Sequence, residues 1–480
     1  MSLESTFPWK LSLVALLLAT CLILACLIAP MRAAILVGAV IGFVVFCMIA
    51  LRHPEVFLVA CVFMPQWKTA WPLSLVDRSV DLTLVMLGGL LIGTAWRLLK
   101  HVSGLDRRSV ADLFRGQWLV ISSYCLFCFV VALSYMYTTA PHYGETKLLR
   151  FLLIGTLFLV SGLVLINQEI DFRRFSFLFV GCGFVTAIQM VLHLKQRAVG
   201  AEGDITRIGA GWLMGMSLLL LVCYPFFEKA KHNSILMAIG LPFLSGGLIA
   251  SAARGPIVSV ALILPLTYFW FSGRRLVAGR AFLAGLLLLS CVGSYAYLRH
   301  ADPDKYSSKI SELLELSKGD SASGSGAKRI NFYRTTLAAI PDHFWFGNGV
   351  GSWSVFYYGK DAREYPHNLF LETTFEEGIV GQLSLFLFLT LVIVSSYLNL
   401  TRGNRQFGVL IGLLLYSLLI SMFSGDLDDN RLLWFWTGVT LAACRNTSLW
   451  WRMTSPLGLR RFSPENEASL FELRPPRLSA

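Results

Sequence analysis

The sequence is poor in charge. Asp, Glu, Lys and Arg make up 15% of its 480 residues, whereas 55% of the residues are hydrophobic and the mean hydropathy is +0.63. These values exclude an ordinary soluble globular protein and predict a polytopic helical membrane protein. The net charge of +12 suits anionic partners such as lipid headgroups or diphosphates, although much of such an excess simply sets topology. Nucleic acid is not an expected partner.

The sequence also shows no cleavable signal and no disulfide framework. The first apolar run, 11–29, contains no A-x-A site and is therefore predicted to be a retained span. The ten cysteines lie in or at the edge of apolar runs. Cys125 and Cys128 form a CxxC inside YCLFCFVVAL, where apolar fillers on a helix face are expected rather than a redox or zinc site. No internal repeat stands out, so one integrated membrane domain is expected.

Apolar runs long enough to cross a bilayer predict an all-α transmembrane bundle of about 12–14 spans. A short run at 55–65 is expected to be either a tilted span or a re-entrant piece. The longer runs lie near 11–29, 33–51, 81–96, 117–136, 148–166, 175–194, 209–227, 233–252, 255–272, 280–298, 379–398, 406–424 and 431–445.

The distribution of Arg and Lys among the connections predicts which side of the membrane each connection faces. The connections rich in Arg and Lys fall on one face together with the tail after residue 445, and this face is cytoplasmic by the positive-inside rule. Both termini are then cytoplasmic. The opposite face receives 137–147, 195–208, 299–378 and the acidic turn GDLDDN at 425–430. The expected organisation is an N-terminal bundle (1–298), an outer loop (299–378), C-terminal helices (379–445) and a mostly disordered cytoplasmic tail (446–480).

The outer loop is patterned rather than linker-like. Residues 304–318 predict a helix with one apolar side that lies on the membrane or packs on the spans. SASGSG at 321–326 predicts a flexible hinge. A second helix is expected over KRINFYRTTLAAI and should end at Pro341, after which the glycines of FGNGVGSW permit tight turns.

The most informative segment is KDAREYPHNLFLETTFEEGIVG at 360–381, which contains His367 directly after Pro366. Asn368 to Glu377 predict the start of a helix. A histidine in the first turn of a helix faces the positive end of the macrodipole, which disfavours its protonated form. The sequence thus predicts a neutral imidazole that can act as a general base beside the membrane surface.

Three arginines are predicted to lie at the same outer surface as this histidine. Arg207 lies in DITRIGAG before a span, Arg254 lies in SAARGPIVS between two apolar runs, and Arg329 opens the second loop helix. Arg254 is flanked by apolar sequence on both sides, where a charge is costly and therefore indicates function. Snorkelling to the interface or pairing with a carboxylate is the alternative for each arginine.

These residues carry a resemblance to a known family. Arg254-Gly255 heads a span, Lys328-Arg329 has aromatic neighbours, and TLAAIPDHFWFGNGVGSW is followed by PHNLFLETTFEEGIVG. In these features residues 250–381 resemble the O-antigen ligase and polymerase family of bacterial membrane glycosyltransferases. The Pro-His-Asn…Glu-x-Gly-x-x-Gly block is specific, whereas a single Arg-Gly is weak.

The resemblance implies an all-helical, GT-C-like fold in the inner membrane with a periplasmic active site. It implies a glycan on undecaprenyl diphosphate as the donor, and it carries the family's essential arginines onto Arg254 and Arg329 and its essential histidine onto His367. Arg207 matches a third basic position. Two arginines can bind the diphosphate, which leaves as an anion, so a single base suffices and no metal or other cofactor is expected. Attack opposite the leaving group would invert the anomeric centre. Trp353 and Tyr365 stand where aromatic residues could stack on sugars.

Two other functions are compatible with the sequence. A flippase for lipid-linked glycans would also carry many spans and charges within them, but it would not need an ordered outer loop with a histidine, and no inverted repeat is visible. A metal-dependent oligosaccharyltransferase could use Asp426, Asp428 and Asp429 as ligands for Mg²⁺ or Mn²⁺. In a short turn between spans, however, these acids are expected to be solvated rather than ligands.

The acceptor stays open among three choices. A ligase passes the glycan to lipid A–core, a polymerase passes it to a second lipid-linked glycan, and a protein O-oligosaccharyltransferase uses serine or threonine. The pattern favours the ligase slightly.

Overall fold

A computed structural model describes residues 30–70, 82–103, 117–166, 169–192, 201–224, 230–251, 253–271, 296, 325–401 and 406–445. Within these ranges the chain forms helices and no strand. The first helices are α2 (Pro30–Arg52), α3 (Pro54–Ala70), α4 (Leu82–Val102), α6 (Trp118–Ser134), η3 (Tyr135–Tyr137), α7 (Pro141–Arg150), η4 (Phe151–Gly155), α8 (Thr156–Leu165) and α9 (Glu169–Leu192). They are followed by α10 (Ala201–Cys223), α11 (Ala230–Ala250), α12 (Arg254–Phe271), α15 (Ser325–Ala339), η6 (Ile340–His343), α16 (Trp353–Tyr358), α17 (Leu369–Thr401), α18 (Gln406–Ser421) and α19 (Arg431–Arg445).

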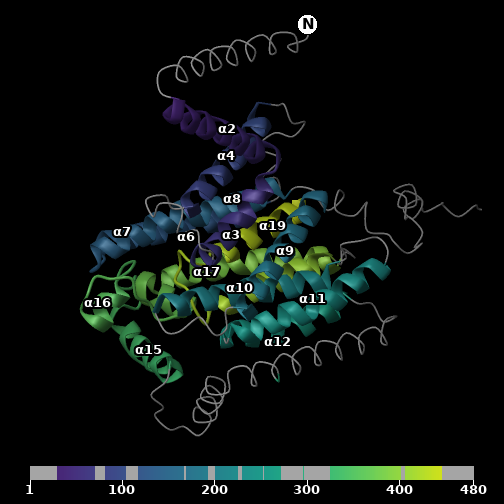
Figure 1. Cartoon of the computed structure of the whole chain (residues 1–480). Helices are drawn as coiled ribbons and strands as arrows, with labels where there is room; N and C mark the ends of the chain where they lie inside the picture. Colours follow the sequence, from purple (N-terminus) through teal and green to yellow (C-terminus); the bar gives the residue numbers. More distant parts are fainter. Residues whose placement is uncertain are drawn as a thin grey trace, which may run out of the picture.

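Six of the described helical segments are long and apolar enough to cross a membrane. They are Leu82–Lys100, Trp118–Tyr137, Pro141–Leu165, Asp171–Val191, His232–Ala250 and Leu369–Asn399. Three shorter apolar helices, Arg207–Cys223, Arg254–Tyr268 and Phe407–Ser421, pack among them. The predicted all-α, polytopic helical membrane fold is therefore confirmed (Figure 1).

The structure leaves the predicted number of about 12–14 spans open. The runs 11–29 and 280–298 lie wholly or almost wholly outside the described residues, as do the predicted helix 304–318 and the tail 446–480. The short run 55–65 lies in α3, whose apolar part is bent by 106° from that of α2. Such a bent pair is either one broken span or a re-entrant loop. The re-entrant alternative was predicted from the sequence, whereas the other prediction was a tilted span of its own.

The bundle is held together by close helix packing. α19 lies along α8, where a Cβ atom added to Gly438 would come within 2.0 Å of the carbonyl oxygen of Leu159. On the facing side, a Cβ atom on Gly162 would come within 2.4 Å of the carbonyl oxygen of Phe435. Small residues that let two backbones approach this closely are typical of helix pairs in membranes. α19 thereby places the acidic turn that precedes it at a fixed point of the bundle.

α17 consists of two helical stretches joined at a sharp kink. It begins at Leu369 and bends at Gly378, where φ is 70° and ψ is −168°. The first stretch agrees with the helix predicted from Asn368 to Glu377, and the second begins where a span was predicted, at residue 379.

The glycine-rich segment 344–349 replaces the helical hydrogen bonds that the kink removes. Asn348 N donates to Phe375 O at 2.9 Å and Gly349 N to Glu376 O at 2.8 Å. On the other side of the kink, Ile379 N donates to Phe344 O at 2.9 Å. Because the loop satisfies the orphaned backbone groups, the break carries little cost and the two halves of α17 keep a fixed angle.

The structure corrects the prediction for residues 137–147, which contain the start of α7. Residues 137–147 were expected to be an outer loop, yet a helix begins at Pro141 and continues through η4 and α8 as the apolar segment Pro141–Leu165. Asp361, from the outer loop, caps its N-terminus by accepting hydrogen bonds from His142 N at 2.8 Å and Tyr143 N at 2.9 Å. Lys147 consequently lies inside the bundle.

α15 is the predicted second loop helix, and it ends at Ala339, immediately before η6, which contains Pro341. The predicted hinge over 321–326 is wrong for its described residues, because Ser325 and Gly326 already belong to α15. α7, α15 and α16 lie at the same end of the bundle (Figure 1).

Candidate active site

His367 lies in a strained turn at the entrance to α17. Its φ of 59° makes it a non-glycine residue in the left-handed region. The side-chain oxygen of Asn368 accepts hydrogen bonds at 3.1 Å from both Phe370 N and Leu371 N, so Asn368 is the N-cap of α17. The prediction that His367 belongs to the first helical turn is therefore wrong: it directly precedes the cap.

Aromatic rings surround the imidazole. The ring of Phe332 is stacked on it with centroids 6.2 Å apart and planes 20° apart. The ring of Tyr365 meets it edge-on with centroids 4.6 Å apart. Nδ1 of His367 is buried and has no hydrogen-bond partner among the described residues. The orientation of the imidazole is thus set by packing against rings.

The electrostatic environment favours the neutral imidazole. Burial, reinforced by the positive charges of Arg329 and Lys328, lowers the pKa of His367 to about 4, against an opposing effect of Asp426. The predicted neutral form agrees with this shift, but its cause differs from the predicted one. Desolvation and nearby cations produce it, in place of the helix macrodipole.

The charge of Arg329 reaches His367, and the charge of Arg254 reaches Arg329. Burial is the largest effect on Arg329 and lowers its pKa; Tyr333 and Tyr365 oppose this, and the charge of Arg254 lowers it further. Two guanidinium groups that repel each other are stabilised when an anion binds between them.

A chain of contacts explains why residues so distant in sequence meet. Arg254 is the first residue of α12, and a Cβ atom on the next residue, Gly255, would lie 3.0 Å from Phe423. The residue before Phe423, Met422, accepts a 3.3 Å hydrogen bond from the hydroxyl of Tyr333. The same hydroxyl is 3.3 Å from the carbonyl oxygen of His367. The starts of α12 and α17, the end of α18 and one face of α15 therefore converge.

Arg207, the third predicted arginine, is half-buried in α10. One helical turn further on, a Cβ atom at Gly211 would lie 3.1 Å from Pro256 and 3.2 Å from Ala253. Residues four apart share one face of a helix, so Arg207 lies one turn from the point where α10 meets the start of α12.

The two aromatic residues singled out from the sequence have different surroundings. Trp353 is 0% exposed, donates a 2.8 Å hydrogen bond to Thr336 and stacks on Tyr357. It is a core residue, so the prediction that it could stack on a sugar is wrong. Tyr365 is half-buried and contacts the imidazole, so it remains at the site.

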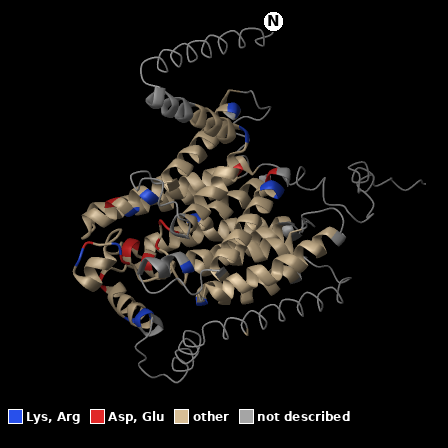
Figure 2. Ribbon diagram, in the orientation of Figure 1, with Lys and Arg blue, Asp and Glu red and all other residues tan. Residues whose placement is uncertain are grey.

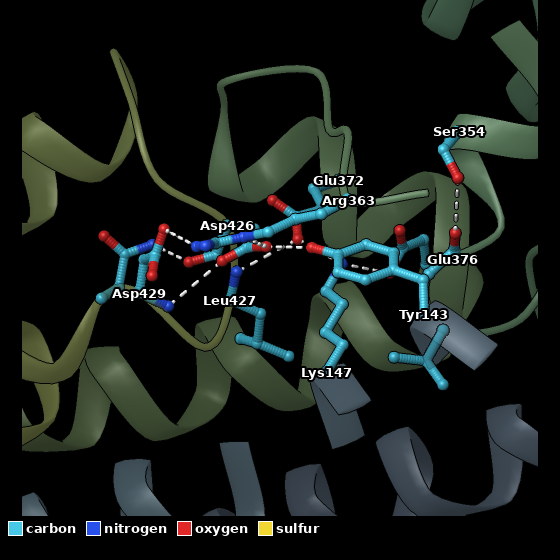
Figure 3. A network of polar contacts seen from close by, with 12 residues as sticks. Tyr143, Lys147, Ser354, Arg363, Glu372, Glu376, Asp426, Leu427 and Asp429 are labelled. Carbon is cyan, nitrogen blue, oxygen red and sulfur yellow. Dashed lines mark hydrogen bonds and ion pairs between the residues drawn. The ribbon is translucent and has the colours of Figure 1, made fainter. Parts of the chain in front are cut away.

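The acidic turn at 425–430 is not the solvated turn expected from the sequence. Asp426 is 0% and Asp428 4% exposed. Asp426 accepts a hydrogen bond from the hydroxyl of Tyr143. Arg363 lies 2.5 Å from Asp429 and 3.9 Å from Asp426 (Figure 3). Arg150 lies 3.6 Å from Asp428.

The three aspartates bring carboxylate oxygens within 4.8 Å of one another, a spacing that can hold a metal ion. The charges around them weaken this possibility. Burial, followed by the hydrogen bond and charge of Asp426, raises the pKa of Asp428 to about 9. A carboxyl group that is neutral near pH 7 is a poor cation ligand. Burial also acts to raise the pKa of Asp426, but its hydrogen bond with Asp428, with help from Lys147 and Arg363, lowers it overall.

The sequence did not single out the charged residues behind this turn. Lys147 is fully buried and forms ion pairs with Glu372 and Glu376, the latter at 2.6 Å. Glu372 also accepts a 3.1 Å hydrogen bond from Leu427 N, which ties α17 to the acidic turn. The available signal was the i, i+4 spacing of the two glutamates at the edge of an apolar run. Figure 2 shows acidic residues gathered beside α7 and α16, at one end of the bundle.

Comparison with known proteins agrees with this geometry. Residues 239–387 match the family model described as O-antigen ligase. The matched segment contains Arg254, Arg329 and His367 and confirms the predicted resemblance. It supports a membrane glycosyltransferase of the O-antigen ligase or polymerase type, with lipid-linked glycans as substrates. No curated protein matches the chain.

Proposed function

We propose that the protein is an inverting, metal-independent glycosyltransferase that moves a glycan from undecaprenyl diphosphate to an acceptor hydroxyl at the periplasmic face of the inner membrane. The observation that carries the proposal is the convergence of His367, Arg329 and Arg254 from three separate elements. The family match over the same residues supports the donor class.

Arg254 and Arg329 bind the diphosphate in this mechanism. Guanidinium groups present paired N–H donors that fit phosphate oxygens bidentately, and they neutralise the charge that develops as the anomeric C–O bond breaks. The bond's electron pair leaves with the diphosphate. Because that leaving group is already a stable anion, no general acid is needed. Arg207 extends the basic surface along α10.

His367 acts as the general base. Its unprotonated nitrogen accepts the proton of the acceptor hydroxyl while the oxygen attacks the anomeric carbon on the face opposite the diphosphate, which inverts the configuration. A pKa of about 4 keeps the base unprotonated at neutral pH, although it also makes the imidazole a weaker base. Positioned base catalysis contributes roughly a hundred- to ten-thousand-fold.

The acceptor that we propose is lipid A–core, as for a ligase. A polymerase that uses a second lipid-linked glycan, or a protein O-oligosaccharyltransferase, would use the same three residues for the same displacement. A flippase is the alternative from another class, but lipid-linked glycan transport by itself needs no general base.

A deletion strain tests the proposal and separates these alternatives. Loss of a ligase should leave long glycans on the lipid carrier, whereas loss of a polymerase should leave single repeats. Complementation with His367→Ala should fail if the protein is a transferase and succeed if it is a flippase. Transfer by the purified protein should persist in EDTA; its loss, with restoration by Mg²⁺ or Mn²⁺, would favour a metal site at the acidic turn.

A further inference from the structure

Among the residues that the structure describes, Nδ1 of His367 has no hydrogen-bonded partner of the kind that orients most catalytic histidines. In catalytic triads and metal sites, the second ring nitrogen donates to a carboxylate or a carbonyl, and this bond fixes the ring and its tautomer. Here Nδ1 is buried without a hydrogen-bond partner in the described part of the chain. The charge of Asp426 reaches the imidazole. Its oxygen Oδ2, however, accepts a hydrogen bond from the hydroxyl of Tyr143.

The backbone of His367 also requires support. A φ of 59° costs a residue with a side chain conformational energy and persists only where the surroundings over-determine it. The N-cap at Asn368 fixes one side of the turn. The carbonyl group of His367 is held as well, because the hydroxyl of Tyr333 lies 3.3 Å from its oxygen.

Tyr333 links the turn at His367 to the end of α18. Its hydroxyl is shared between His367 O and Met422 O, each at 3.3 Å, and so joins the end of α18 to the start of α17. The residue beside it on α15, Phe332, provides the ring stacked on the imidazole. Phe332 is buried in its own small cluster with Trp353 and Phe375. The two neighbours therefore hold His367 at its backbone and at its ring.

We propose that Tyr333 and Phe332 are positioning residues for His367, doing by backbone anchoring and ring stacking what a carboxylate does in a triad. The proposal rests on the proposed function, because it assigns these residues to the general base of that reaction. α15 then contributes to the binding of both substrates. Phe332 and Tyr333 position the base that accepts the proton of the acceptor hydroxyl, and Arg329 on the same helix binds the diphosphate of the donor.

Tyr333→Phe tests the anchoring, because it removes one hydroxyl and keeps the ring. We expect kcat to fall by about ten- to a hundredfold, because a small displacement of a catalytic group lowers the rate by about this factor. KM for the donor should change by less than about twofold. The acid limb of the pH profile should shift upward from about pH 4, because a less confined imidazole is better hydrated. The matched control is Tyr357→Phe, which removes a hydroxyl bonded to Asn331 at 2.7 Å in the same aromatic cluster and should leave all three quantities unchanged.

A second measurement reports on the imidazole without using activity. Carbethoxylation of His367 by diethyl pyrocarbonate, followed by mass spectrometry of its peptide, should be several-fold faster in Tyr333→Phe and in Phe332→Leu than in the wild type or the control. If both variants show the wild-type modification rate, kcat and pH profile, the positioning role is overturned.

His367→Ala, measured beside them, separates this proposal from the proposed function. If His367→Ala is inactive and Tyr333→Phe behaves like the wild type, only the positioning role fails. If His367→Ala transfers glycan at the wild-type rate, the proposed base fails, whatever the modification rates show.

Discussion

The ammonium nitrogen of Lys147 lies 2.6 Å from Oε2 of Glu376, and both side chains are buried. The same ammonium pairs with Glu372, which also accepts the N–H of Leu427 in the acidic turn. α7, α17 and this turn are consequently joined inside the bundle by charge. These contacts tie the start of α17, which follows His367, to α7 and to the acidic turn.

Removing the cation should therefore be costly. Lys147→Met leaves two buried glutamates without their counter-charge, and breaking a buried pair in this way destabilises a protein by about 3–5 kcal/mol. We expect a clear loss in the free energy of unfolding, measured by denaturant titration in detergent micelles. The matched control is Lys360→Met, at an exposed lysine, which should change stability by no more than about 0.5 kcal/mol. Equal stability of the two variants would show that the cluster does not depend on Lys147.

The strained turn at His367 makes a prediction that is independent of catalysis. Glycine adopts φ near 59° without a steric penalty, so His367→Gly should be more stable than His367→Ala by about 1 kcal/mol. Both variants lose the imidazole and its contacts, so their comparison isolates the backbone. A thermal unfolding midpoint that is higher for the alanine variant would contradict the left-handed conformation.

The kink of α17 predicts a sharp difference between two glycines. A Cβ atom at Gly378 would lie 2.4 Å from the carbonyl oxygen of Trp345, whereas a Cβ atom at Gly359 meets nothing within 4 Å, although both residues have positive φ. Gly359→Ala should cost about 1–2 kcal/mol. Gly378→Ala should in addition displace the 344–349 loop and fail to give a stable, monodisperse protein on gel filtration. Similar behaviour of the two variants would contradict the packed kink.

The pKa of His367 predicts the pH dependence. Its folded value of about 4 lies below the ordinary 6.5. Between these values the unfolded chain binds a proton that the folded protein does not, so stability falls as the pH drops from about 6.5 to about 4. The single-turnover rate, measured from about pH 8 to about pH 4.5, should stay flat until near the lower value. Lys328→Gln removes one of the charges that lower this pKa and should move the acid limb upward. A wild-type limb centred at 6.5 would place the imidazole in water.

The fold class and the candidate residues could be predicted from the sequence because both depend on local patterns. Long apolar runs allow only helices to span a bilayer, and Arg254, Arg329 and His367 stand in short recognisable motifs. A helix from Asn368 to Glu377 and a span from residue 379 were both predicted, but the kink at Gly378 that joins them was not, because the 344–349 loop completes it. That hydrogen bonding joins segments about thirty residues apart and leaves no local pattern.

The burial of individual polar and aromatic side chains could not be predicted from the local sequence either. Asp426 and Asp428 stand in a polar turn and were expected to be solvated, yet they are covered by Tyr143, Arg150 and Arg363 from other elements. Trp353 was expected to stand where it could stack on a sugar, and it lies in a core. Charge and aromaticity indicate chemistry, but whether a side chain is exposed depends on which distant segments cover it.

The most direct test of the account is single-turnover transfer of a labelled glycan from purified undecaprenyl diphosphate donor by the reconstituted protein. We predict that His367→Ala and Arg254→Ala each abolish transfer while the protein remains inserted and folded, and that Arg254→Lys also fails because one ammonium cannot bind two phosphate oxygens as a guanidinium does. Wild-type rates for His367→Ala would contradict the central claim.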